Sequence, residues 1–120
     1  MKELKRLAEE ARRSEHGEGY AVVHDSPRLR VGVGARHDGK DWKHFVEVTL
    51  RLRSDLPSRE RAALEGERLG QIEQLLSMGF QYTSEDPFGT VMERPLSAKE
   101  VRPLLAKLER TLLQGLHQAP

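Results

Sequence analysis

The fold is decided by residues 29–48, LRVGVGARHDGKDWKHFVEV, in which apolar side chains alternate with polar or small ones. Alternation with a period of two is typical of strands that have one buried face. Asp38-Gly39 divides the stretch, and both residues tolerate the positive φ of a two-residue type I′ turn. That turn pairs His37 with Lys40 and predicts an antiparallel hairpin. The inward face of this hairpin then holds Leu29, Val31, Val33, Ala35, Trp42, His44, Val46 and Val48.

The outward face of the same hairpin combines positive charge with an aromatic ring. The predicted register places Arg30 opposite Glu47, and Gly32 opposite Phe45, so that the ring covers a strand glycine. The second strand is expected to continue through outward-facing arginines before Asp55. This face is therefore a candidate basic surface, whose members are Arg28, Lys43, Phe45, Arg51 and Arg53.

A strand and a helix flank the hairpin. The strand covers residues 20–24, and its inward face stays open because two- and three-residue loops at 25–27 would send opposite side chains inward. The helix is predicted from an N-cap at Ser58 to Met78, with Gly79 as the residue that ends it. The main apolar stripe predicted for this helix is Leu69, Ile72 and Leu76.

The C-terminal third predicts a second hairpin and a final helix. The hairpin joins residues 80–83 to residues 89–93, and the helix opens with a capping box formed by Ser97 and Glu100. Pro103 is expected to kink the first turns of that helix or to displace its start, because proline lacks the amide hydrogen. The apolar stripe of this helix is Val101, Leu104, Leu105, Leu108, Leu112 and Leu116.

With a short amphipathic helix at residues 1–15, the predicted order of elements is α-β-β-β-α-β-β-α. This order indicates a single α+β domain over residues 1–120, with an antiparallel sheet packed against helices. It resembles the order found in type III secretion chaperones of the Tir-chaperone class. The resemblance implies a homodimer that binds an extended segment of a partner protein across sheet and helix surfaces.

Composition narrows the classes of function. The chain has 20 basic and 19 acidic residues, so a nucleic-acid or membrane surface has to come from local clustering of charge. The absence of cysteine excludes disulfides and thiolate chemistry. No apolar run is long enough to span a bilayer, and the charged N-terminus leads into no apolar signal region. We therefore expect a cytoplasmic protein without a membrane partner.

Candidate catalytic and metal-binding residues form no pattern specific to such a site. His24 and His44 would bind a metal only if they converged with a carboxylate, which their spacing does not require. The Gly32-Val33-Gly34 stretch opens no helix and so lacks the context of a phosphate-binding loop. No serine stands in a nucleophile-elbow motif. We expect no catalysis, no cofactor and no metal.

The sequence favours a non-catalytic, homodimeric protein-interaction module, chaperone-like or adaptor-like, that binds an unknown protein. Small residues on the second helix would let another backbone approach, and leucines cover a wide arc of the last helix. The predicted interface is Gly66, Gly70, Leu104, Leu108, Leu112 and Leu113. The alternative is a single-stranded nucleic-acid-binding protein that uses the basic outward face of the hairpin.

Overall fold

The computed structural model describes residues 6, 9, 18–38, 41–51, 57–86 and 89–113. Arg6 and Glu9 are helical, and the rest of the predicted first helix lies outside the described residues. The elements that follow are β1 (Glu18–Asp25), β2 (Leu29–Asp38), β3 (Asp41–Arg51), α2 (Ser58–Ser77), β4 (Gln81–Asp86), β5 (Gly89–Leu96), α3 (Ala98–Leu108) and the π-helix η1 (Glu109–Leu113). The predicted α+β class and the predicted order of these elements are confirmed.

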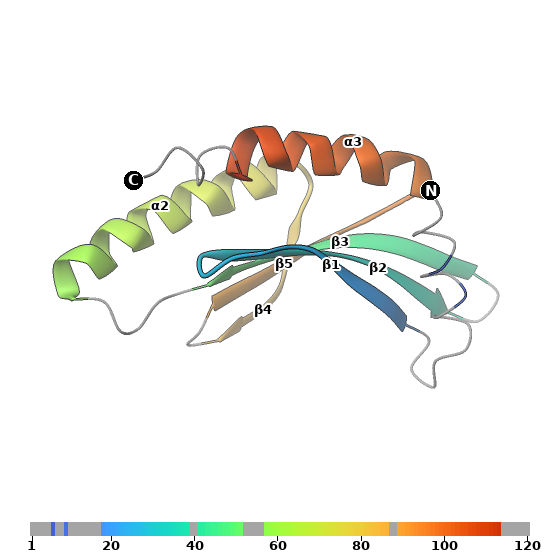
Figure 1. Cartoon of the computed structure of the whole chain (residues 1–120), viewed down its shortest axis with the longest axis horizontal. Coiled ribbons are helices and arrows are strands. Elements are labelled where there is room, and N and C mark those ends of the chain that lie inside the picture. Colours follow the sequence, from blue (N-terminus) through green and yellow to red (C-terminus); the bar gives the residue numbers. More distant parts are fainter. Residues whose placement is uncertain are drawn as a thin grey trace.

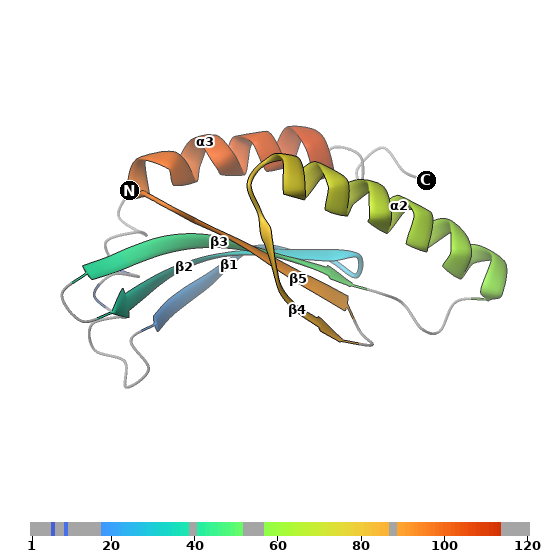
Figure 2. The same cartoon turned by 180° about the vertical axis from the view of Figure 1, so that it is seen from behind.

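The five strands form one open antiparallel sheet in the order β1-β2-β3-β5-β4. Both α2 and α3 lie on the same face of this sheet, as two opposite views show (Figure 1, Figure 2). The first half of α2 extends past the ends of the strands (Figure 1). No helix within the described ranges covers the other face, which we call the open face of the sheet.

The register of the first hairpin differs by two residues from the prediction. Asp38 pairs with Asp41, so the loop is Gly39-Lys40, and Leu29 pairs with Leu50. A shift of two residues leaves every side chain on its predicted face, because side chains alternate with a period of two. The observed register pairs Leu50 with Leu29 on the apolar face, and both side chains are buried.

The core lies between the sheet and the two helices. The hairpin supplies the predicted inward residues, joined by side chains from β5 and from the helices. Trp42 was also predicted to face inward, but its side chain lies outside the described part of the chain. The core residues are Leu29, Val31, Val33, Ala35, Val46, Val48, Leu50, Ile72, Leu75, Met78, Phe80, Met92, Leu96, Val101, Leu104, Leu108 and Leu112.

A Schellman motif ends α2 where the sequence predicts it. Gly79 has φ +89°, and the amide of Phe80 donates a hydrogen bond to the carbonyl of Leu75 at 3.0 Å. The side chain of Phe80 is buried in the core, which turns the chain from α2 into β4. The predicted N-cap is wrong by one residue: Pro57 is the N-cap, and Ser58 is the first helical residue.

The capping box fixes the start of α3 at the predicted position. The backbone amide of Ser97 donates to Glu100 Oε1 at 3.5 Å, and the Ser97 hydroxyl donates to the same atom at 3.0 Å. Pro103 lies inside the helix and does not displace its start. At the other end, η1 continues the chain as a wider π-helical turn that still presents Leu112 to the core.

A register shift interrupts each edge strand of the sheet. In β1 the pairing with β2 skips Val23, and in β4 the pairing with β5 skips Thr83. The shift in β1 determines which side chains of this strand face the helices, a point that the sequence leaves open. Ala21 faces the helices before the shift, and His24 does so after it, because the extra residue reverses the alternation.

Two glycines of β2 make room for aromatic rings on the open face. A Cβ built on Gly34 would overlap the ring of Phe45, and one built on Gly32 would overlap the ring of Tyr20. We therefore expect Gly34→Ala to lower the free energy of unfolding by about 1–3 kcal/mol, the usual effect of overpacking. Urea denaturation would measure this change. Gly70→Ala is the matched control, because its Cβ would meet nothing within 4 Å, and an equal loss in both variants would contradict the packing argument.

Candidate functional site

The exposed face of α2 is the most accessible apolar surface on the described helices. Leu69 is 61% exposed and Leu76 is 46% exposed, although both were predicted to lie in the core stripe. That prediction is wrong: Ile72, Leu75 and Met78 are the buried residues of this helix and its C-cap. Leu69 and Leu76 are left on the side of α2 that faces away from the sheet.

Two ion pairs accompany this rotation of α2. Arg68, one residue before Leu69, turns toward the sheet and pairs with Glu85 of β4 at 3.4 Å. Glu67 pairs with Arg28, in the β1–β2 turn, at 3.6 Å. These contacts join the middle of α2 to β4 at one edge of the sheet and to the β1–β2 turn at the other, and Leu69 is exposed to solvent.

Small residues surround Leu69 on this exposed face. A Cβ added at Gly66 or at Gly70 would meet nothing within 4 Å, so neither glycine is needed for packing inside the described chain. Each glycine costs the helix about 1 kcal/mol relative to alanine. At about 100° per residue these positions share one face of α2. We call it the α2 face, and its members are Arg59, Ala62, Ala63, Gly66, Leu69, Gly70 and Glu73.

Charges stand at the two ends of the α2 face in a symmetric arrangement. Arg59 precedes Gly66 by seven residues, and Glu73 follows Gly66 by seven residues. Both side chains are exposed, and no ion pair or hydrogen bond joins either of them to another described residue. A cation and an anion therefore lie about 10 Å from Gly66 along the helix axis, in opposite directions.

The other predicted interface residues lie elsewhere. Leu104, Leu108 and Leu112 were expected on a surface that a second protein contacts, but all three belong to the core. The apolar stripe of α3 packs on the sheet, so these leucines are buried in the core and are not available for a second contact. The side chain of Leu113 lies outside the described part of the chain. Among the members of the predicted set whose side chains are described, only Gly66 and Gly70 are exposed.

The open face of the sheet carries a pair of aromatic rings, but not the exposed aromatic that the sequence suggests. Tyr20 and Phe45 stack with ring centroids 6.5 Å apart. The guanidinium of Arg36 lies 4.7 Å from the centroid of Phe45, and that of Arg30 lies 5.6 Å from the centroid of Tyr20. Phe45 is only 4% exposed. Its ring is therefore closed to a stacking base.

Carboxylates pair with several cations of this face. Arg36 binds Glu18 at 2.8 Å and Glu93 at 3.2 Å, which links β1, β2 and β5. Arg51 binds Asp25 at 3.0 Å. Of the predicted basic surface, Lys43 is exposed on this face, Arg28 pairs with Glu67 of α2, and Arg53 lies outside the described residues. A phosphate would have to displace these carboxylates from Arg36 and Arg51. This arrangement is therefore unfavourable for nucleic-acid binding on this face.

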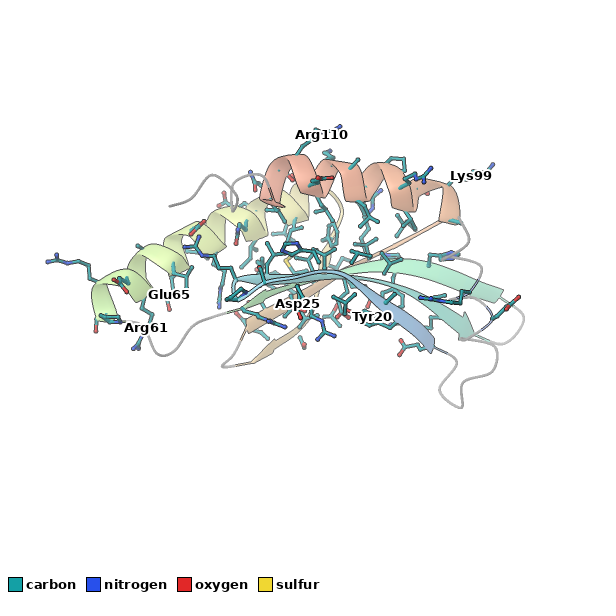
Figure 3. The ribbon with its side chains drawn as sticks, in the orientation of Figure 1. Tyr20, Asp25, Arg61, Glu65, Lys99 and Arg110 are labelled. Atoms are coloured by element: carbon teal, nitrogen blue, oxygen red, sulfur yellow. The ribbon has the colours of Figure 1, made fainter. Side chains whose placement is uncertain are left out.

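The Tyr20 hydroxyl belongs to the same network and points away from the helices (Figure 3). It donates a hydrogen bond to Glu47 at 3.2 Å. Burial, followed by the negative charge of Glu47, raises the pKa of Tyr20 to about 12. The charged form is disfavoured in the folded protein, so this hydroxyl contributes stability below its ordinary pKa of 10.0, and that contribution is lost as the pH rises through 12.

This shift of the Tyr20 pKa can be measured by ultraviolet titration. Tyr82→Phe leaves Tyr20 as the only tyrosine of the chain. We expect its phenolate absorbance to appear with a midpoint near pH 12 in the folded protein, and near pH 10 after denaturation. Removing the anion with Glu47→Gln is expected to lower the folded-state midpoint. A midpoint near pH 10 in the folded Tyr82→Phe variant would contradict the burial of this hydroxyl.

The outer surface of α3 and η1 holds a basic cluster that is not among the predicted site residues. Its members form two pairs, the second residue of each pair three positions after the first, on the side opposite the leucine stripe. This spacing of basic residues in the sequence was the signal from which the cluster could have been predicted. We call this surface the α3 cation cluster, formed by Lys99, Arg102, Lys107 and Arg110.

Histidines and carboxylates do not gather into a metal site in the described ranges. His24 pairs with Val31 across the sheet, whereas the buried His44 pairs with Ala35, further along the same strand. None of the helices placed by the structure is long and apolar enough to cross a membrane. Comparisons with family models, with curated proteins and with solved structures found no match to the chain.

Proposed function

We propose that this protein is a homodimeric protein-interaction module that assembles through the α2 face. The observation that carries the proposal is the exposure of Leu69, at 61%, beside two glycines that have open space around them. A helix that keeps two costly glycines on one face, where nothing in the described chain touches them, is suited to close contact with another backbone.

A second copy of the chain fits this face in an antiparallel arrangement. With a two-fold axis at Gly66, Arg59 of each copy lies opposite Glu73 of the other, which gives two equivalent ion pairs. Leu69 then lies opposite Ala63, where a small side chain leaves room for it. A two-fold interface requires a surface that is complementary to itself, and the charges of the α2 face meet that requirement.

Sedimentation equilibrium tests the proposed dimer directly. The face is narrow, so we expect a dissociation constant in the micromolar range, roughly −8 kcal/mol of binding free energy. The apparent mass should rise from monomer to dimer between about 1 and 200 μM protein. A chain that sediments as a monomer throughout this range would refute assembly through α2.

The proposed activity is the binding of a protein segment, without chemistry on it. The two helices occupy one face of the sheet and leave strand and helix surfaces free for a partner (Figure 1). This activity agrees with what the chaperone-like order of elements implies. The open face is a less suitable surface for single-stranded nucleic acid, because Phe45 is covered and Arg36 and Arg51 are paired.

A further inference from the structure

The four cations of the α3 cation cluster are exposed and gather on one side of the continuous helix formed by α3 and η1, without carboxylate partners in the described part of the chain. No carboxylate among the described residues lies within ion-pair distance of its four side chains, whereas Arg28, Arg36, Arg51, Arg68 and Arg94 are all paired. Of the two acids of α3 and η1, Glu100 is bonded to Ser97 and Arg94, and Glu109 is exposed beside Arg110 without an ion pair to it. Lys99 and Arg110 point away from the sheet at the two ends of the cluster (Figure 3).

The spacing of the cluster defines the shape of a ligand. Lys99 and Arg102 form one pair, and Lys107 and Arg110 form a second pair, eight residues or about 12 Å further along the axis. Ala106 lies between the pairs and is exposed, and its short side chain leaves room for a ligand between the two positive ends. A ligand with two pairs of negative charges at the same separation can contact both ends at once.

We propose that the α3 cation cluster binds a short acidic segment of a partner protein. This inference rests on the proposed function as a protein-interaction module and names the chemistry of its partner. Two observations favour a short segment over nucleic acid. Residues 98–113 contain no aromatic residue on which a base could stack. The pI of about 8.1 is below the range typical of nucleic-acid-binding domains.

Charge elsewhere on the protein supports the same choice. Duplex DNA carries a charge about every 1.7 Å along its axis and would extend past the cluster. On α2 it would meet several exposed carboxylates, which repel it. A segment with four carboxylates ends within the cluster and avoids them. The exposed acids of α2 are Glu60, Glu65, Glu67 and Glu73.

Fluorescence anisotropy with a labelled probe tests the inference on the full chain. The probe is a helical peptide rich in alanine and glutamine, with four glutamates spaced as the four cations are. We expect saturable binding at about 50 mM salt that weakens as salt screens the charges. Lys99→Glu with Arg110→Glu should weaken binding about tenfold, because two attractive contacts become repulsive.

The matched control reverses two charges on α2, with Arg59→Glu and Arg61→Glu. It changes the net charge equally and weakens the proposed dimer, but it should leave peptide binding within about twofold of the parent protein. Sedimentation of the same samples reports the dimer separately, so failure of the dimer and failure of the cluster are distinguishable. Equal losses in both double variants, or no peptide binding at all, would overturn the cluster as a site. Tighter binding of a DNA duplex, lost in the α3 variant, would replace the acidic segment with nucleic acid.

Discussion

Leu69→Glu is expected to yield a folded monomer. Leu69 is exposed in the single chain, so a glutamate there remains solvated and leaves the core unchanged. In the proposed dimer the substitution appears twice and places a carboxylate against the apolar side chains of the α2 face, where burial without a partner is unfavourable. We expect the dissociation constant to rise at least tenfold, about 1.4 kcal/mol, as measured by sedimentation equilibrium.

Two further variants sharpen this prediction. Gln74→Glu adds the same charge to an exposed position on the shoulder of α2, about 80° around the helix from Gly66, and should leave the dimer intact. Gly66→Ala should act with opposite signs in two measurements. It raises the stability of the monomer by about 1 kcal/mol, and it weakens the dimer by adding a methyl group at the axis. A Gly66→Ala protein that dimerises as before would exclude Gly66 from the closest contact.

Leu108→Ala is expected to lower the free energy of unfolding by about 2–5 kcal/mol, because it empties a fully buried position in the core. Leu108 is 1% exposed and lies in the last turn of α3. Chemical denaturation with urea would measure the loss. For a domain of this size, the larger values approach the total stability of the fold.

Leu69→Ala is the matched control for Leu108→Ala, since it deletes the same atoms from an exposed site. At a protein concentration below the dissociation constant of the dimer, we expect it to change stability by less than about 0.5 kcal/mol. Similar losses in the two variants would contradict the burial of Leu108. The same reasoning applies to Leu112, which is 3% exposed, so Leu112→Glu is expected to unfold the protein and not to yield a folded monomer.

The sequence predicts the faces of the first hairpin and the end of α2 because these depend on local rules. Alternation assigns Val31 and Val46 to the core in both the predicted and the observed register, and Gly79 ends α2 through its positive φ. The register itself is less determined, since shifts of two residues keep the same side chains inward. The sequence signal for the turn therefore gave the right faces with a pairing displaced by two residues.

The rotation of α2 could not be predicted from its own residues. Apolar side chains at Leu69, Ile72, Leu75 and Leu76 cover too wide an arc to choose one face. The face that is buried packs on side chains of the sheet, and Arg68 contacts Glu85. These partners are distant in the sequence and are placed there by the sheet. For the same reason the sequence identified Gly66 and Gly70 as a candidate contact but assigned Leu69, beside them, to the core.

The interrupted pairing of β1 and β4 has a consequence for the protein at high concentration. A straight, unpaired edge strand is a template on which further chains add and aggregate. Here each edge bends at the skipped residue, Val23 or Thr83, so an incoming strand would lose its hydrogen-bond register partway along. The bulges thus oppose the addition of further strands at either edge of the sheet.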